Sequence, residues 1–216
     1  MMSPSISDSG RAICNSRLVA SVVQIRDAQP ADAPLIAWDL ETATDRMFSL
    51  MLGAGWERIL TRVVSASGHA WSLEHARIAD DDGKPLGVIL SGPSDLPPPD
   101  DAFGLPWGWT RLRLTAVGLA CQPFLSFMEH HGAGEWYITA ISVKPEARGQ
   151  GVGAALIGDA VKRARAAGMT SVTLDVDEKN AVARRLYERQ GFELQATSPT
   201  AWLVGGVRVQ RMRRGI

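Results

Sequence analysis

A glycine-rich run between residues 148 and 153 has the composition of a phosphate-binding loop. Its sequence, Arg148-Gly-Gln-Gly-Val-Gly153, lies between a strand-like stretch and a helix-like stretch. Glycines leave the backbone open to a ligand, and the first N–H groups of a helix have no partner within the helix. The helix dipole adds partial positive charge at the same place. The sequence therefore predicts a site for a phosphate or pyrophosphate at this junction.

Two known nucleotide-binding loops can be compared with this run. A Walker A loop would end in Gly-Lys-Ser or Gly-Lys-Thr, which the sequence does not contain. A dinucleotide fingerprint fits the spacing better, with Gly149, Gly151 and Ala154 followed by Asp175 or Asp177 as the ribose ligand. However, the chain after Asp177 is too short to complete a doubly wound sheet. A dinucleotide-binding protein is therefore the weaker alternative.

A second motif, Asn180-Ala-Val-Ala-Arg-Arg-Leu-Tyr187-Glu-Arg-Gln-Gly-Phe192, follows at helical spacing. Together the two motifs make the sequence resemble the GNAT superfamily of acetyl-CoA-dependent N-acetyltransferases. The family's loop reads Q/R-x-x-G-x-G/A, and its later helix reads N-x-x-A-x-x-L-Y-x-x-x-G-F. The clear match covers residues 135–196. The resemblance implies an α/β (α+β) fold, with a mixed, mostly antiparallel sheet flanked by helices.

The resemblance also implies acetyl-CoA as the co-substrate and no metal. The coenzyme would lie where strands over 136–143 and 171–176 splay apart. Its pantetheine arm would pair with the first strand, and its pyrophosphate would bind the loop. The cofactor-binding residues implied in this way are Ile141, Ser142, Val143, Arg148, Gly149, Gln150, Gly151, Val152, Gly153, Asn180, Ala183 and Tyr187. Asn180 is also a good helix N-cap, and this local role does not exclude the other.

Acetyl transfer to an amine needs a base for the nucleophile and an acid for the leaving thiolate. Glu135 stands thirteen residues before Arg148, where part of the family has a catalytic base. Tyr187 stands where the family commonly has its general acid. The alternatives are that Glu135 only ends an exposed loop and that Tyr187 only packs on a helix face. The resemblance favours catalytic roles for both residues.

The pattern of apolar and turn residues predicts the elements that position these groups. We expect strands over 22–26, 73–79, 86–90, 136–143, 171–176, 192–195 and 201–212. Helices are expected over 31–43, 45–64 with a break near Gly53 and Gly55, 151–167 and 180–190. Residues 80–85 should form a turn longer than two residues, 91–106 a loop, and 107–131 a partly helical region.

The domain organisation predicted from these elements is a flexible tail over 1–20 and one N-acetyltransferase domain over 21–216. Within that domain, residues 21–131 form the acceptor-side half, 135–196 the acetyl-CoA-binding core and 197–216 the closing strand.

Basic and acidic residues balance over the whole chain, at 23 Lys and Arg against 23 Asp and Glu. This argues against a uniformly basic nucleic-acid binder. The balance is uneven, because residues 1–140 hold 10 basic and 16 acidic side chains whereas residues 141–216 hold 13 and 7. The basic part contains the predicted site for a polyanionic coenzyme, and the acidic part would attract a cationic amine.

Several localisation and partner classes lack a signal in this sequence. No apolar run reaches the roughly 18 residues that span a bilayer, and the first 20 residues lack the apolar stretch of a secretory signal. The cysteines, Cys14 and Cys121, form no zinc-binding pair and suit a reducing compartment. We therefore expect a cytoplasmic protein with no membrane or nucleic-acid partner.

The function predicted from the sequence is acetyl transfer from acetyl-CoA to a primary amine by direct attack, with Glu135 as base and Tyr187 as acid. The acceptor would be a small-molecule amine, a peptide N-terminus or a lysine, and a homodimer is possible because it is common in the family. The alternative is a non-catalytic acyl-CoA-binding or regulatory module on the same fold.

Overall fold

The computed structural model describes residues 23–216 except 45, 100–107 and 203–204. The tail predicted over residues 1–20 lies outside this part of the chain. The strands are β1 (Gln24–Asp27), β2 (Ala76–Asp81), β3 (Lys84–Pro93), β4 (Glu135–Val143), β5 (Ser171–Asp177), β6 (Glu193–Thr197) and β7 (Val209–Gly215). The α-helices are α1 (Ala33–Ala43), α2 (Met47–Leu52), α3 (Trp56–Ser65), α4 (Trp109–Ala120), α5 (Gln122–Glu129), α6 (Val152–Ala166) and α7 (Ala181–Arg189). Short 3-10 helices are η1 (Pro30–Asp32), η2 (Gly53–Gly55), η3 (Leu73–His75) and η4 (Pro145–Ala147).

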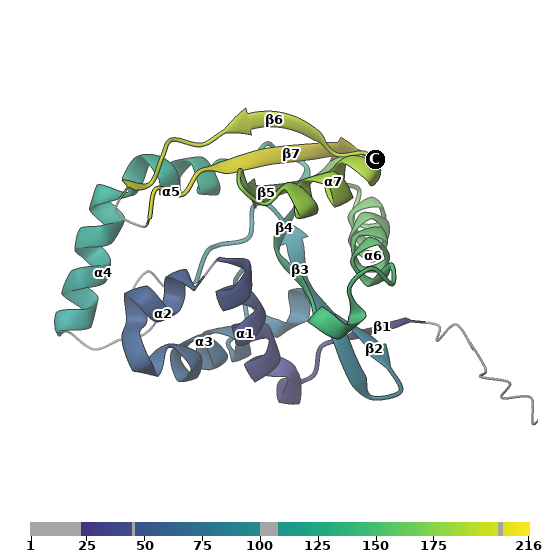
Figure 1. The fold of residues 1–216 in the computed structure, drawn as a ribbon, viewed down its shortest axis with the longest axis horizontal. Coiled ribbons are helices and arrows are strands. Elements are labelled where there is room, and N and C mark those ends of the chain that lie inside the picture. Colours follow the sequence, from purple (N-terminus) through teal and green to yellow (C-terminus); the bar gives the residue numbers. More distant parts are fainter. Residues whose placement is uncertain (1–22, 45, 100–107, 203–204) are drawn as a thin grey trace, which may run out of the picture.

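The strands form one seven-stranded sheet in the order β1-β2-β3-β4-β5-β7-β6. Only β4 and β5 pair in parallel, because the connection between them is the crossover helix α6. Figure 1 shows α1, α2 and α3 together on one side of the β3–β4 region, with α6 on the other side. The predicted α/β fold, a mixed and mostly antiparallel sheet flanked by helices, is confirmed.

A bulge in β4 divides the sheet into two regions. Leu90 of β3 faces Ala140, but the next residue, Ser91, faces Ile138, so one residue of β4, Thr139, is left over. The parallel pairing with β5 covers only Glu135–Ile138 and ends at this point. Beyond the bulge, β4 continues beside β3 without β5 on its other edge. The predicted separation of these two strands is therefore present.

The bulge also changes which face of the sheet each β4 side chain reaches. Trp136 and Ile138, before the bulge, pack with Leu156 of α6 in one apolar core. Ala140, after the bulge, packs with Ile36 of α1 in a second core on the opposite face. The end of β4 is thus held between α1 on one side and α6 on the other.

Three predicted boundaries were wrong, and each has a local cause. The turn after β2 has only two residues, Asp82 and Gly83, whose φ angles of 50° and 84° are those of a tight hairpin turn. The strand expected over 73–79 begins at Ala76, because Leu73–His75 form η3. The closing strand begins at Val209, because Gly205 and Gly206 take positive φ angles and turn the chain first.

The region over 107–131, expected to be partly helical, contains α4 and α5. The two helices meet at Cys121, whose φ of −96° and ψ of 8° are not helical. Pro123 follows in the first turn of α5, where the missing N–H of proline costs no helical hydrogen bond. Most of the expected loop over 91–106 either extends β3 to Pro93 or lies outside the described residues.

Candidate active site

The loop before α6 has the geometry of an anion-binding site. Gly149 and Gly151 take φ angles of 76° and 83°, which are strained for any residue with a side chain. Gly151 is the N-cap of α6. Among the described residues, no backbone carbonyl accepts from the N–H groups of residues 149–154. These unpaired donors lie at the positive end of a 15-residue helix, which suits a pyrophosphate.

The side chains of this loop fasten it to neighbouring elements. The Arg148 Nε group donates to the Val143 carbonyl at 3.1 Å, and the Gln150 amide donates to the Glu146 carbonyl at 2.8 Å. Val152 is buried in the core beneath the loop. A Cβ atom on Gly153 would lie 3.2 Å from Leu186 Cδ2, so glycine lets α6 approach α7 closely. The two motifs identified in the sequence are therefore neighbours in space.

The end of β4 offers an unpaired strand edge next to this loop. Ile141 and Val143 pair with β3, opposite Ile89 and Gly87. On the other edge, the described pairing with β5 stops at Ile138. An extended chain with amide groups, such as pantetheine, can add to an edge of this kind. Ile141, Ser142 and Val143 lie where the resemblance places the pantetheine arm.

The start of α7 has the local structure that its sequence predicts. The Asn180 Oδ1 atom accepts a hydrogen bond from the Ala183 N–H at 3.0 Å, which makes Asn180 the N-cap. The capping interpretation of Asn180 is thus confirmed, and its contact with pantetheine stays a prediction. Ala183 is partly buried against the same core as the end of β4.

Tyr187 of α7 is a buried phenol beside the parted strands. Only 7% of the residue is exposed, and its ring lies 6.0 Å from that of Phe192. Burial, with a smaller contribution from the negative charge of Asp39, raises the pKa of Tyr187 to about 12. The phenol is therefore protonated at neutral pH, as a general acid must be.

Asp39 of α1 is a site residue that the sequence analysis missed. It is 2% exposed, and among the described residues neither carboxylate oxygen has a hydrogen-bond partner. Burial raises the pKa of Asp39 to about 7, and the nearby Ser142 hydroxyl lowers it somewhat although it lies outside hydrogen-bonding geometry. The one signal in the sequence is a carboxylate between Trp38 and Leu40, on a helix whose residues before Asp39 are all apolar.

Glu135 lies at the opposite end of β4 from the loop. Glu135 as a whole residue is 8% exposed. Its carboxylate accepts a hydrogen bond from the Gly132 N–H at 2.9 Å and forms an ion pair with Arg213 Nε at 3.3 Å. Six residues separate it from Ile141, which is about 20 Å along a strand. Among the described residues, Glu135 makes no hydrogen bond or ion pair with Tyr187. The role of Glu135 as a base stays a prediction.

A second polar cluster joins α5 to the sheet. Arg211 of β7 donates to both carboxylate oxygens of Asp175, at 3.0 and 2.8 Å, and also to the Phe127 carbonyl at 2.8 Å. Tyr137 donates to Asp175 at 3.1 Å. The Asp175 side chain is only 2% exposed. This buried pairing leaves Asp175 unsuited to the ribose role that the dinucleotide alternative gave it.

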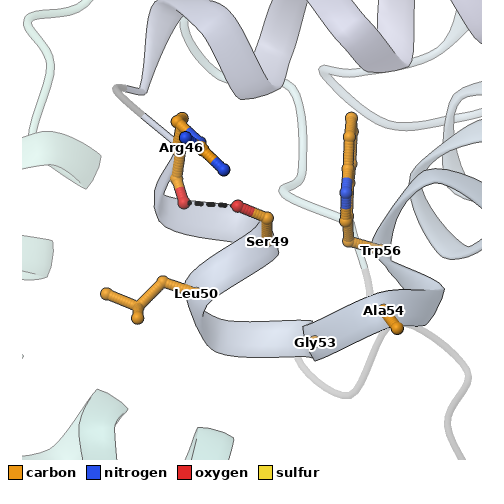
Figure 2. A pocket seen from close by; sticks show the side chains of 6 residues that line it. All are labelled: Arg46, Ser49, Leu50, Gly53, Ala54 and Trp56. Carbon is orange, nitrogen blue, oxygen red and sulfur yellow. Dashed lines mark hydrogen bonds between the residues drawn. The ribbon is translucent and has the colours of Figure 1, made fainter.

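An open hollow of about 540 Å³ lies on the acceptor-side half, over α2 and η2. Figure 2 shows Arg46 and Trp56 on either side of it, with the Ser49 hydroxyl donating to the Arg46 carbonyl at 3.0 Å. The residues that line it are Arg46, Ser49, Leu50, Gly53, Ala54 and Trp56. None of these belongs to the loop, the end of β4 or α7, so this hollow is separate from the predicted coenzyme site.

The described residues offer neither a metal site nor a membrane-spanning helix. No three His, Cys, Asp or Glu side chains converge there in a way that could hold a metal ion. Among the helices in the same part of the chain, none combines the length and apolar character required to cross a bilayer.

Comparison with known proteins agrees with the two sequence motifs. Residues 42–192, more than half of the chain, match the Acetyltransferase (GNAT) family. The mycothiol acetyltransferase of Thermobispora bispora is 46% identical over 84 residues, which is 39% of this chain and 24% of that protein. The mycothiol acetyltransferase of Streptosporangium roseum is 41% identical over 63 residues, which is 29% of this chain and 18% of that protein. The matched segment thus spans less than a quarter of either relative.

Solved structures show the same fold at low sequence identity. An N-acetyltransferase from Staphylococcus aureus Mu50 superimposes with a TM-score of 0.64 at 16% identity, over 88% of this chain and 99% of that one. A GCN5-related N-acetyltransferase from Kribbella flavida gives a TM-score of 0.55 at 23% identity, over 90% and 98% of the two chains.

Proposed function

The chain belongs to the GNAT acetyltransferase family and is an acyltransferase. We propose that it moves an acetyl group from acetyl-CoA to a primary amine by direct attack. Acetyl-CoA is the co-substrate typical of the family. The observation that carries the proposal is the junction of an open strand edge with a helix start. Within the described part of the chain, residues 141–143 have no β5 partner and the N–H groups of residues 149–154 have no backbone acceptor.

Binding follows from these two features. The pantetheine amides would pair with the edge at Ile141 and Val143, and the pyrophosphate would accept from the N–H groups of the loop. The N–H group near Ile141 would polarise the thioester carbonyl and stabilise the oxyanion. These contacts bring the reacting carbon to the point where β4 and β5 separate.

Proton transfer needs an acid on the thiolate side and a base on the amine side. Tyr187 is proposed as the acid, because its phenol is buried beside this point and stays protonated at neutral pH. Glu135 is the base that the family resemblance predicts. The Glu135→Gln variant tests this role, since it removes the charge and keeps a hydrogen-bond acceptor for the Gly132 N–H.

The acceptor is proposed to be a small amine, a peptide N-terminus or a lysine. The acidic excess of residues 1–140 favours a cationic acceptor. Because two relatives are mycothiol acetyltransferases, amines related to mycothiol belong in the first panel to be tested.

The proposal is tested by measuring release of coenzyme A thiol from acetyl-CoA with a panel of amines. We expect amine-dependent release and a matching mass increase of 42 in the acetylated product, about the mass of an acetyl group less one hydrogen. A chain that binds acetyl-CoA in calorimetry but acetylates no amine would instead support the non-catalytic acyl-CoA-binding module.

A further inference from the structure

Asp39 is the one buried, unpaired carboxylate at the described site that the proposed mechanism leaves unused. Both of its oxygens are shielded from water and have no hydrogen-bond partner among the described residues. Burying an unpaired carboxylate destabilises a protein, so such groups are concentrated where function requires them. The position of Asp39 therefore needs an explanation in terms of a ligand.

Asp39 lies on the helix that packs over the end of β4. It lies on α1, which packs over the part of β4 beyond the bulge, where Ala140 joins the α1 core. The Ser142 hydroxyl, one residue from Ile141, is close enough to influence the Asp39 carboxylate. Tyr187 approaches the same point from α7, in the core on the opposite face of the sheet.

Asp39 and Tyr187 are therefore a buried carboxylate and a buried phenol on two helices, α1 and α7, that contribute to the two cores meeting at the end of β4. The charge of Asp39 acts on the Tyr187 phenol, which shows that the two groups are within electrostatic range. With pKa values of about 7 for Asp39 and about 12 for Tyr187, the carboxyl can lose its proton near neutral pH while the phenol keeps its own. Glu135, in contrast, lies about 20 Å along the strand from Ile141 and is already paired with Arg213.

We propose that Asp39, in place of Glu135, is the base of the reaction: it binds the ammonium group of the acceptor and takes a proton from its nitrogen during attack, so that the acceptor is a primary amine that arrives as a cation. This inference rests on the acetyl transfer proposed above. Two unpaired carboxylate oxygens match two N–H donors on one nitrogen. A hydroxyl or thiol acceptor would satisfy only one of them.

The proton count of the reaction closes with these two residues. An ammonium acceptor first releases one proton to solvent. The amine nitrogen then bonds to the carbonyl carbon and gives a proton to Asp39, while the carbon–sulfur bond breaks and the sulfur takes the Tyr187 proton. As the amide and free coenzyme A thiol leave and water enters the site, Asp39 loses its proton and the Tyr187 phenolate regains one, which restores both groups.

The acid–base properties of Asp39 suit this role. Its pKa of about 7 is close to the pH at which the reaction would run, which is where a general base works best. The titratable group that faces it is Tyr187 of α7. The elements packed against α1, namely η1, α2, α3, β3 and β4, contribute no charged side chain of the described residues that shifts the pKa of Asp39.

The test compares the Asp39→Asn variant with the wild type and with Glu41→Gln as a matched control. Glu41 is a buried carboxylate of the same helix that accepts from the Ser49 N–H, away from the site. Amine-dependent thiol release should fall about 100- to 10,000-fold in kcat/KM for the Asn variant and stay near wild type for the control. Acetyl-CoA affinity by calorimetry should be unchanged in both, which also verifies folding.

The pH profile gives a second, independent readout. Wild-type kcat/KM should rise with pH through about 7, because the base must be ionised. Ser142→Ala should move this rise to higher pH, because the Ser142 hydroxyl lowers the pKa of Asp39. Wild-type rates and an unmoved profile in Asp39→Asn would overturn the role of Asp39 and leave acetyl transfer standing. Failure of the wild type to acetylate any amine would overturn both.

Discussion

The burial of Asp39 predicts that this residue makes the protein less stable as the pH rises. The carboxyl has a pKa of about 7 in the folded chain, against an ordinary value of 3.8. Between these values the folded state binds more protons than the unfolded state, so the free energy of unfolding must fall with increasing pH. Below about pH 4 both states are protonated, and the effect vanishes.

The size of this effect follows from the difference between the two pKa values. Each pKa unit corresponds to about 1.4 kcal/mol, so an ionised Asp39 destabilises the fold by about 4 kcal/mol above pH 7. Between pH 5 and pH 8 the change amounts to roughly 3 kcal/mol. Asp39→Asn removes the titration, whereas the cost of burying its amide is the same at every pH.

Urea unfolding at pH 5 and pH 8 measures the effect. We expect the wild type to lose about 3 kcal/mol more than Asp39→Asn over this range, a relative shift of about 1.5 M in the urea midpoint. The Glu41→Gln control should keep the wild-type pH dependence. Identical pH dependence in the wild type and Asp39→Asn would refute the argument that Asp39 is buried without a partner.

Three further predictions follow from the site and its supports. Tyr187→Phe should lower kcat about 100-fold or more in the thiol-release assay while acetyl-CoA affinity changes little; unchanged turnover would exclude Tyr187 as the acid. Gly151→Val should abolish acetyl-CoA binding in calorimetry, because φ at this position is 83°, and equal affinity in this variant would contradict the loop assignment. The control Gly158→Ala, in the middle of α6, should bind acetyl-CoA normally and be about 0.5–1 kcal/mol more stable. Arg211→Met should lower the free energy of unfolding by about 3–5 kcal/mol, because it leaves the buried Asp175 charge unpaired, and a loss below 1 kcal/mol in urea unfolding would show that the pair contributes little.

The parts of the site that could be predicted from the sequence are those built from local chemistry. The loop at 148–153 is specified by glycines at positive φ next to a helix start, and α7 is specified by its Asn180 cap and its apolar spacing. Both signals lie within a few consecutive residues. The crossover from β4 through α6 to β5 also follows from the order of the elements alone.

The errors arose where distant contacts or an unusual backbone decide the outcome. The pair Asp82-Gly83 is a strong hairpin signal, but its neighbours over 80–85 are turn-type residues too, and only the pairing of β2 with β3 shows that Asp81 and Lys84 belong to the strands. The bulge at Thr139 depends on the register between β3 and β4. No local pattern marks it, yet it sets where β4 and β5 separate.

The sequence by itself determined the family, the fold class and the local structure of the 148–153 loop and of α7, because short motifs specify backbone geometry. Only the tertiary structure brought Asp39 of α1 towards Ser142 of β4 and Tyr187 of α7, three residues up to 148 positions apart in the chain. It also paired Glu135 with Arg213. Electrostatic environment and burial are properties of packing, so the character of these carboxylates is decided by the neighbours that the fold supplies.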